Sequence, residues 1–534
     1  MAPRVRLPAG GGAAIGLALS AAVTVLPAVT VLPAATRPAA PAAARSPRDP
    51  ALQALRARFV ERAQRGAWPS LALAVVRDGR VEWLEAFGWA DRSRGAAATP
   101  STLYALGSLS KSITATAVLQ LVERGRVRLE DPIVRYGVRL PDPLGVASGA
   151  TVDRLLRMTA GVPHGKWQAP AASRAPLPTT ADLLSRFGGP VAAPGERYLY
   201  SNLSYGALEL VVAHGAARSF DAFLREELFA PLGMSRSGTG PGPAADSDLA
   251  RKHGADGLPF ASDYRFLPPG GGGLYSCAAD LARFALLHLG ALDGAGLPTR
   301  AGLRRWHDAT APGEPSHQRY FAGWGVIDDG ATRSLLSDGQ VAGSNTALLL
   351  LPQARLGVVC LVNRTGSDAL ELAVEIVDAL RPGYRAAFFR YVEEFERAES
   401  GFSSVGVQAL AGRWRGTAWT GATPRALEVE TTADGSTRWR FAGLAPVALD
   451  GAAFSSGPET HLHGIRFAPP GLVGTLPGVD LIRGELRDGA RLEIQLSPRG
   501  PELVGGATNY LGDDMVPVVI RLEREARDPG APGP

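Results

Sequence analysis

Only three lysines occur in this chain, Lys111, Lys166 and Lys252, although lysine and arginine together number 56. The first of them follows Ser108 by three residues in the run G-S-L-S-K, a spacing that puts both side chains on one face of a helix. A desolvated lysine can lose its proton near neutral pH, whereas arginine cannot. Ser108 and Lys111 therefore form a candidate nucleophile and base, with an accidental S-x-x-K as the alternative.

A phenol and an amide stand together in a second polar motif, Tyr200-Ser201-Asn202, which precedes a predicted helix. Taken alone, Tyr200 is compatible with a half-buried phenol and Asn202 with a helix cap. Beside a lysine, however, a phenol shares its proton more readily, and both groups can act on a serine hydroxyl within hydrogen-bond reach. The two motifs predict an activated serine near a helix N-terminus, where the helix dipole lowers the lysine pKa and favours an oxyanion.

Hydrophobic periodicity predicts the elements that must position these residues. Helices are expected at 51–64, 108–124, 151–158, 205–214, 220–228, 278–289, 367–380 and 385–399, and strands at 71–76, 81–84, 323–327, 345–351 and 356–362. Strands thus occur at both ends of this region, and helices fill its middle. The pattern predicts an α/β fold in which distant parts of the chain complete one antiparallel sheet around a helical insertion.

The pattern changes after residue 399. Residues 400–406 are predicted to be a linker, and alternating segments follow at 426–431, 438–441, 484–486 and 492–496. Residues 407–525 are therefore predicted to form a separate all-β, barrel-like domain with a structural or positioning role. The domain that carries both polar motifs is predicted to span 46–399, and residues 526–534 are predicted to be a disordered tail.

The first 45 residues are organised like a leader for export. Arg4 and Arg6 precede an apolar run over 13–32, and an Ala/Pro-rich stretch then offers small-residue cleavage sites. An uncleaved membrane anchor is the alternative, but Pro27 and Pro33 interrupt the apolar run. Residues 1–45 are therefore predicted to be a signal peptide and leader. This predicts an exported protein, periplasmic or extracellular, with no membrane span after cleavage.

Composition and spacing argue against two other classes of function. The net charge is +5, but the arginines alternate with acidic residues and form no basic block, so no nucleic-acid partner is predicted. Cys277 and Cys360 lack zinc-ligand spacing, and His461 and His463 have no third ligand nearby. No metal and no cofactor is predicted, and the sequence indicates no oligomeric state.

Several segments of the chain, taken in order, resemble the serine β-lactamase-related family. They are residues 104–132 (YALGSLSKSITATAVLQLVERGRVRLEDP), the Y-S-N segment with residues 231–234 (PLGM), residues 271–284 (GGGLYSCAADLARF) and residues 322–325. The family includes class C β-lactamases, D-alanyl-D-alanine carboxypeptidases, D-aminopeptidases and family VIII esterases. The resemblance spans roughly residues 50–385 and implies a β-lactamase/transpeptidase-like fold.

The resemblance also implies roles for individual residues. Ser108 would be the acylated nucleophile, Lys111 its proton acceptor and Tyr200 the group that carries a proton to the leaving group. Asn202 would contact the substrate amide or orient Lys111. The backbone amides of Ser108 and Gln340 would hold the oxyanion of the tetrahedral intermediate.

The third family motif is altered in this chain. Where the family usually has K-T-G or H-x-G, followed by a glycine four residues on, the chain has Ser337-Asp338-Gly339 and then Gly343. In the family the basic residue helps to hold a substrate carboxylate. Ser337 at that position and the nearby Asp338 are therefore expected to weaken the binding of anionic ligands. Asp338 on the opposite strand face would limit this effect, and a plain S-D-G turn is the alternative.

A second departure lies at Met158 and Ala160, where the family often has H-T-S-G. Three hypotheses follow. The first is an exported, metal-independent serine hydrolase that cleaves an ester or amide of a small molecule or peptide, with neutral esters or modified peptides favoured over β-lactams. The second is a degenerate member that binds peptide or cell-wall ligands without turnover, since both departures flank the site. The third is an interaction protein whose β domain carries the function.

Overall fold

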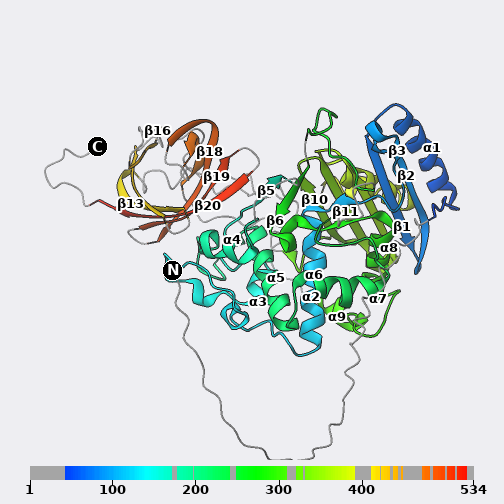
Figure 1. Cartoon of the computed structure of the whole chain (residues 1–534), viewed down its shortest axis with the longest axis horizontal. Coiled ribbons are helices and arrows are strands. Elements are labelled where there is room, and N and C mark those ends of the chain that lie inside the picture. Colours follow the sequence, from blue (N-terminus) through cyan, green and yellow to red (C-terminus); the bar gives the residue numbers. More distant parts are fainter. Residues whose placement is uncertain are drawn as a thin grey trace, which may run out of the picture. The chain divides into compact units, whose positions relative to one another are not determined.

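The structure is a computed structural model of the chain (Figure 1). It describes residues 43–170, 177–196, 198–240, 248–261, 263–308, 320–328, 331–390, 411–420, 423–432, 437–442, 447–448, 472–480, 485–499, 502–511 and 514–525. Residues 1–42 of the predicted leader, the predicted linker 400–406, the predicted tail 526–534 and the two histidines at 461 and 463 lie outside this set. Within the described residues, no helix has the length and apolar character needed to cross a membrane.

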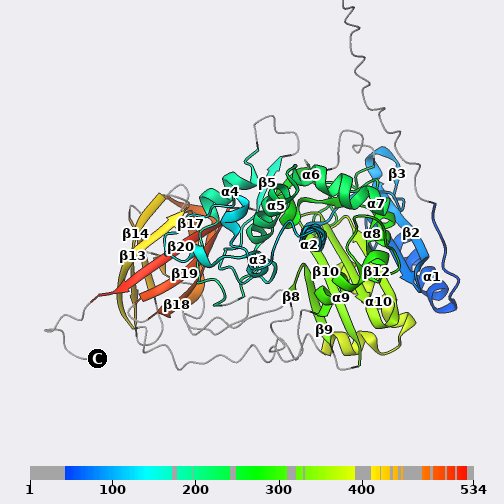
Figure 2. The same ribbon diagram turned by 90° about the horizontal axis from the view of Figure 1, so that it is seen from below.

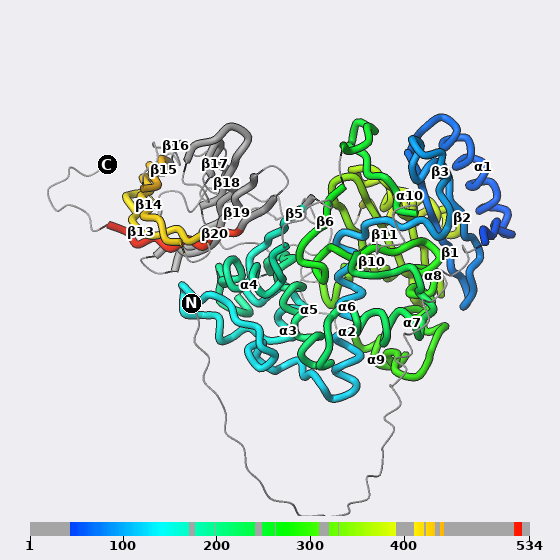
Figure 3. The backbone as a smooth tube through the Cα atoms, viewed as in Figure 1, coloured from blue at the N-terminus to red at the C-terminus, as the bar shows by residue number. Residues whose placement is uncertain are grey.

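An eight-stranded antiparallel sheet, in the order β3-β2-β1-β12-β11-β10-β9-β8, forms the centre of the region that carries the polar motifs. Its strands are β1 (Ser70–Arg77), β2 (Arg80–Asp91), β3 (Ala96–Ala97), β8 (Tyr320–Phe321), β9 (Trp324–Asp328), β10 (Arg333–Val341), β11 (Ser344–Leu351) and β12 (Leu356–Val362). Because β1 pairs with β12, segments far apart in sequence lie side by side, as Figure 3 shows. This is the arrangement that the sequence predicts.

Helices cover both faces of this sheet. On one face, α1 (Pro50–Gln64) and α10 (Asp368–Leu380) share a hydrophobic core with Leu349 and Val358 (Figure 2). On the other face, α2 (Ser110–Glu123) and α8 (Ala278–His288) share a core with Leu348 and Val359. Successive residues of a strand point to opposite faces, so both sides of β11 and β12 are apolar.

A mainly helical region separates β3 from β8 in the sequence. It contains α2 and α8 together with α3 (Val152–Leu156), α4 (Thr180–Phe187), α5 (Asn202–Ala216), α6 (Phe220–Phe223), a π-helical stretch (Leu224–Phe229), α7 (Ala230–Leu232) and α9 (Arg300–Asp308). Two short strand pairs join this region: β4 (Tyr104–Ala105) with β7 (Tyr275–Ser276), and β5 (Trp167–Pro170) with β6 (Tyr264–Leu267). The packing of α2 against α5 brings the two polar motifs together.

The C-terminal part of the chain forms a second eight-stranded antiparallel sheet, in the order β16-β15-β14-β13-β20-β19-β18-β17. Its strands are β13 (Gly412–Thr420), β14 (Thr423–Thr431), β15 (Thr437–Phe441), β16 (Val447–Ala448), β17 (Leu472–Asp480), β18 (Glu485–Arg499), β19 (Glu502–Leu511) and β20 (Asp514–Arg524). Residues two apart are buried together, as at Leu427 and Val429 or Val518 and Ile520. Along β14 the residues between the buried ones are exposed, so this strand has one apolar face, as expected for a barrel or a sandwich.

Strand β10 is the main element that the periodicity does not predict. Its residues are buried on both sides from Ser334 to Gly339, so the sequence shows no alternation of polar and apolar residues. The S-D-G sequence lies inside this strand, and its alternative interpretation as a plain turn is wrong. Smaller differences occur at helix ends: α5 begins at Asn202, earlier than its periodicity indicates, because Ser201 caps it.

Candidate active site

Ser108 lies in a tight turn at the start of a buried helix. β4 leads into a 3₁₀ turn at Gly107–Leu109, and α2 begins at the next residue. Gly107 has a left-handed backbone conformation (φ 56°), which residues with a side chain rarely adopt. The side chains of α2 are buried from Ser110 to Leu121. The turn therefore presents Ser108 at the edge of the core, with Lys111 one helical turn further on.

The amine of Lys111 contacts three oxygen atoms, all of them on neutral groups. Its Nζ lies 2.9 Å from Ser108 Oγ, 2.7 Å from Asn202 Oδ1 and 2.5 Å from the carbonyl oxygen of Gly271. The residue is 1% exposed, and Nζ lies 4.7 Å from the centre of the Tyr200 ring. The S-x-x-K and Y-x-N motifs thus meet at one amine.

The types of these three neighbours determine how a neutral amine is oriented. An amide oxygen and a backbone carbonyl can only accept hydrogen bonds, whereas a serine hydroxyl can also donate one. The two N–H bonds of an uncharged Lys111 therefore point to Asn202 and Gly271, and its lone pair faces the hydroxyl of Ser108. In this arrangement Lys111 is oriented to accept the serine proton.

The surroundings of Lys111 also favour the uncharged amine. Burial is the largest influence and holds the pKa of Lys111 well below its ordinary value, while the negative charge of Asp338 opposes this effect. A lysine with a strongly lowered pKa is a competent base near neutral pH. The direction of the shift agrees with the prediction from the helix N-terminus, but desolvation is its main cause.

Tyr200 reaches the same hydroxyl from the other motif. Its OH donates to Ser108 Oγ at 2.6 Å. Burial raises the pKa of the Tyr200 phenol, and its hydrogen bond with Ser108 partly opposes that rise. The phenol therefore keeps its proton at neutral pH. Of the two groups beside Ser108, Lys111 is the one suited to act as a base and Tyr200 the one suited to donate a proton.

The segment that carries Tyr200 and Asn202 is fixed by its middle residue. Ser201 is the N-cap of α5, where its Oγ accepts from the backbone N–H of Ser204 at 2.9 Å and donates to the carbonyl of Pro163 at 2.8 Å. Its own N–H points to the sulfur of Met158 at 3.3 Å. Asn202 is therefore free of the capping role and contacts Lys111. Met158, one of the departures from the family pattern, therefore helps to hold the middle residue of this motif.

Gly339 and Gln340 of β10 lie against the turn that holds Ser108. A methyl group added to Gly339 would lie 2.8 Å from the backbone nitrogen of Ser108, and one added to Gly107 would lie 3.0 Å from the backbone nitrogen of Gln340. The two backbones are so close that only glycine fits at these positions. The amides of Ser108 and Gln340 are thereby brought together beside the nucleophile, as an oxyanion hole requires.

The polar residues before Gly339 contribute no positive charge. Ser337 is 1% exposed, and its Oγ donates to Ser112 Oγ on α2 at 3.0 Å. Asp338 is 8% exposed, and its charge raises the pKa values of both Lys111 and Tyr200. In the strand where the family usually has a basic residue, this chain thus has a negatively charged one. Its charge acts on Lys111 and Tyr200.

Comparison with known proteins identifies the family. Residues 55–381, more than half of the chain, match the family model described as Beta-lactamase. The chain belongs to the Beta-lactamase family. It is 30% identical over 332 residues to penicillin-binding protein 4 from Amycolatopsis lactamdurans, a match that covers 58% of this chain and 84% of that protein.

Other relatives in the family are matched over a smaller share of their length. A human beta-lactamase-like protein is 29% identical over 336 residues, which is 60% of this chain and 66% of the human protein. This chain therefore spans just under two thirds of that relative.

A solved structure confirms the β-lactamase/transpeptidase-like fold. The octameric penicillin-binding protein homologue from Pyrococcus abyssi superposes with a TM-score of 0.53 at 20% sequence identity, covering 88% of this chain and 99% of that one. At this identity the likeness concerns the fold alone.

Two groups that contribute to the site cannot be recognised from the sequence motifs: the carbonyl of Gly271 and the carboxylate of Glu209. The carbonyl of Gly271 contacts Lys111 but is a backbone group, and the only signal for it in the sequence is the run of four glycines at 270–273. Glu209 of α5 holds the same glycine segment through the N–H of Gly270. An isolated glutamate on a predicted helix gives no indication of such a contact.

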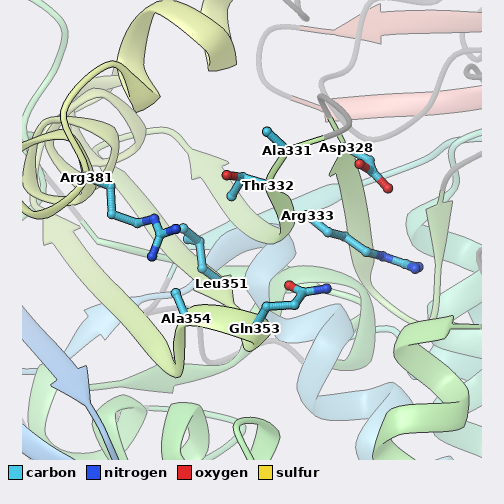
Figure 4. A pocket seen from close by; sticks show the side chains of 8 residues that line it. All are labelled: Asp328, Ala331, Thr332, Arg333, Leu351, Gln353, Ala354 and Arg381. Carbon is cyan, nitrogen blue, oxygen red and sulfur yellow. The ribbon is translucent and has the colours of Figure 1, made fainter.

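A cavity of about 320 Å³ lies at the opposite end of β10 from the site. Its lining comes from the end of β9, the start of β10 with the two residues before it, the end of β11 with the 3₁₀ turn that follows, and the residue after α10 (Figure 4): Asp328, Ala331, Thr332, Arg333, Leu351, Gln353, Ala354 and Arg381. None of the residues around Ser108 lines it. The cavity is therefore separate from the candidate active site.

Proposed function

We propose that this protein is an exported serine hydrolase that cleaves a neutral ester or amide through an acyl-enzyme on Ser108. The observation that carries the proposal is the convergence of Lys111 Nζ and Tyr200 OH on Ser108 Oγ, at 2.9 and 2.6 Å. Membership of the Beta-lactamase family supports serine hydrolase chemistry. The contacts supply the nucleophile, the base and the proton donor that such chemistry needs.

Acylation begins with transfer of the Ser108 hydroxyl proton to the lone pair of Lys111. Oγ then forms a bond to the carbonyl carbon of the substrate, and the carbonyl electron pair moves to its oxygen. The backbone N–H groups of Ser108 and Gln340 donate to this oxyanion, which a preorganised pair of amides stabilises by several kcal/mol, about 3 for each donor. Asn202 and Gly271 keep the charged amine hydrogen-bonded while it holds the extra proton.

Breakdown of the tetrahedral intermediate needs a proton on the leaving group. The Tyr200 phenol can donate its proton and recover one from the Lys111 ammonium, whose Nζ lies beside the Tyr200 ring. The bond between the carbonyl carbon and the leaving group then breaks, and an ester to Ser108 remains. Water hydrolyses this ester by the same route in reverse, with a proton passing to Lys111 and back to Ser108.

The charges around the site favour neutral substrates. Ser337 occupies the position of the family's basic residue and forms a hydrogen bond with Ser112. Asp338 adds a negative charge that reaches Lys111 and Tyr200. A substrate carboxylate would find no cation in this motif and would be repelled by Asp338. We therefore propose neutral esters or modified peptides as the substrate class, in preference to β-lactams.

Export is a separate part of the proposal and comes from the sequence. Arg4 and Arg6 followed by the apolar run over 13–32 are typical of a secretory signal peptide. Fractionation of cells that produce the full chain tests this part. A variant that lacks residues 1–45 is the control. Recovery of the full-length product in the cytoplasm alone would contradict it.

Labelling of the full chain with a fluorophosphonate probe tests the acyl-enzyme mechanism. We expect stoichiometric labelling of the wild-type protein and none of the Ser108→Ala variant, with the modified peptide containing residue 108. An unlabelled wild-type protein that binds peptide ligands would instead favour the degenerate, ligand-binding alternative.

A substrate panel then tests the substrate class. Initial rates with p-nitrophenyl esters, nitrocefin and D-amino-acid peptides should rank the neutral esters first. If nitrocefin were hydrolysed best, the interpretation of Ser337 and Asp338 would be wrong even though the mechanism held.

A further inference from the structure

Glu209 is a partly buried carboxylate on α5 that the proposed mechanism does not use. One oxygen, Oε2, accepts from the backbone N–H of Gly270 at 3.0 Å, and the other, Oε1, accepts from the hydroxyl of Thr180 at 2.9 Å. Asn202 lies two turns earlier on the same helix and contacts Lys111. Helix α5 therefore reaches the base directly through Asn202 and reaches the glycine segment through Glu209.

The glycine segment at 270–273 is held tightly between two helices. From α2, the hydroxyl of Thr114 donates to the carbonyl of Gly270 at 2.9 Å. Against α5, a methyl group on Gly270 would lie 2.8 Å from the carbonyl of Tyr205, and one on Gly271 would lie 2.6 Å from the carbonyl of Asn202. Small shifts of this segment would therefore move the Gly271 carbonyl relative to Lys111.

We propose that Glu209 is a positioning residue for the base: its carboxylate fixes the Gly270 amide so that the next carbonyl, that of Gly271, takes one N–H of Lys111 and aims the amine lone pair at Ser108. This inference rests on the proposed function, in which Lys111 is the base. It concerns how that base is held and assigns to Glu209 no contact with the substrate.

A carboxylate is well suited to this task because it accepts from two donors at once. Its oxygens join Thr180 of α4 to the glycine segment, and hydrogen bonds to a charged acceptor are about twice as strong as neutral ones. Burial raises the pKa of Glu209 to about 7, with the bonds from Gly270 and Thr180 opposing the rise. The fraction of Glu209 in the carboxylate form therefore rises as the pH rises through this value.

Other titratable groups on the surrounding elements have partners of their own. Lys111 on α2 contacts Ser108, Asn202 and Gly271, and Asp182 on α4 is engaged in a capping box with Thr179. Tyr205 on α5 directs its hydroxyl to the carbonyl of Leu156. These contacts make Gly270 and Thr180 the groups through which a change at Glu209 is transmitted.

Loss of the carboxylate should change Lys111 in two ways that a general loss of stability would not produce. A carbonyl oxygen stabilises an ammonium more than a neutral amine, so displacement of the Gly271 carbonyl should lower the pKa of Lys111 further. The amine would also lose the partner that directs its lone pair. In the pH–rate profile of Glu209→Leu we therefore expect an acylation rate about tenfold lower on the alkaline plateau. The acid limb of the same profile should move to lower pH.

The test compares Glu209→Leu, Glu209→Gln and the control Glu226→Gln, all as full chains. Glu226 is exposed and pairs with Arg218 and Arg225, away from the site. Two readouts are taken: the pH dependence of fluorophosphonate inactivation, and the pH titration of the Lys111 Cε signal in protein labelled with [¹³C]lysine. We expect Glu209→Gln, which keeps an acceptor for Gly270, to retain the plateau rate within about threefold, and Glu226→Gln to match the wild type.

The two readouts separate this inference from the proposed function. If the wild type is not labelled by the probe but Glu209→Leu still shifts the titration of Lys111, the hydrolase proposal fails and the positioning role stands. If Lys111 titrates identically in a folded Glu209→Leu variant and in the wild type, the positioning role is overturned whatever the activity. Thr180→Val, which removes only the second donor, should give a smaller shift in the same direction. This variant keeps the inference testable if Glu209→Leu does not fold.

Discussion

The chain buries two lysines, and their surroundings differ in one respect. Lys111 is 1% exposed and contacts a hydroxyl, an amide oxygen and a backbone carbonyl, all neutral. Lys252 is 4% exposed and forms an ion pair with Asp263, together with contacts to the carbonyl of Tyr264 and the hydroxyl of Tyr275. Both amines lie beside a tyrosine ring, Tyr200 at 4.7 Å and Tyr264 at 4.1 Å.

The difference shows what separates a basic lysine from a structural one. Burial lowers the pKa of both residues, but at Lys252 the adjacent carboxylate of Asp263 opposes the effect, whereas Lys111 has only the more distant charge of Asp338. Asp263 therefore favours the charged form of Lys252, whose Nζ also donates to the carbonyl of Tyr264 at the start of β6. Lys111 is held in a form that can accept a proton.

The sharpest way to break this comparison is to make the same substitution at both sites. Lys111→Arg should lower the rate of acylation by about 10³-fold or more, because arginine cannot act as a base near neutral pH. Lys252→Arg should change that rate by less than about threefold, since a guanidinium can keep the pair with Asp263. Stopped-flow inactivation by the fluorophosphonate probe measures both. Equal losses in the two variants would contradict the distinction.

Removal of the second group on Ser108 should have a smaller effect. Tyr200→Phe keeps the ring beside Lys111 and deletes the proton donor, so turnover of an amide or of an ester with a poor leaving group should fall about 10²-fold. Esters with a good leaving group, such as p-nitrophenolate, need no proton and should be less affected. Steady-state rates for a matched pair of esters check this. A uniform loss across leaving groups would argue against proton donation by Tyr200.

Asp263→Asn would make Lys252 resemble Lys111. Asp263 is about one third exposed, so we expect a loss of only about 2 kcal/mol in the free energy of unfolding near neutral pH. Without the carboxylate the folded-state pKa of Lys252 falls further below its unfolded value, so the unfolded chain binds more protons and the variant gains stability as pH rises toward 10.5. Urea unfolding at neutral and alkaline pH measures this. If the loss in free energy of unfolding relative to the wild type grew as the pH rose, the assignment would be contradicted.

Asp338→Asn should give the smallest effect of these changes and should act through the pKa values of Lys111 and Tyr200. The charge of Asp338 raises the pKa of Lys111, so its removal should lower that pKa and move the acid limb of the pH–rate profile for acylation to lower pH. The same variant should accept carboxylate-bearing esters a few-fold better, about threefold. Asp221→Asn, at a half-buried residue paired with Arg225, is the control. An acid limb shifted upward would contradict the electrostatic assignment.

The sequence predicts the reacting groups better than it predicts what holds them. Ser108, Lys111, Tyr200 and Asn202 lie in short motifs whose spacing is itself the signal, and the structure brings all four together. Their catalytic roles stay predictions until they are measured.

The supporting groups are less accessible to sequence reasoning for two physical reasons. The Gly271 carbonyl and the N–H of Gly270 are backbone groups that every residue has, so only the tertiary fold selects them. Strand β10 is buried on both faces and therefore lacks the alternation that identifies a strand. The distant partner of Gly270, Glu209, has no local pattern at all, and only the packing of α5 against the glycine segment shows its contact.

The protonation state of Lys111 tests the account most directly. Because the chain has three lysines, protein labelled with [¹³C]lysine gives three Cε signals, which Lys166→Arg and Lys252→Arg assign. We predict that Lys111 is uncharged at neutral pH and titrates at a lower pH than Lys252, whose carboxylate partner keeps it charged. A Lys111 signal that stays in the charged form up to the ordinary lysine value of 10.5 would contradict its role as the base.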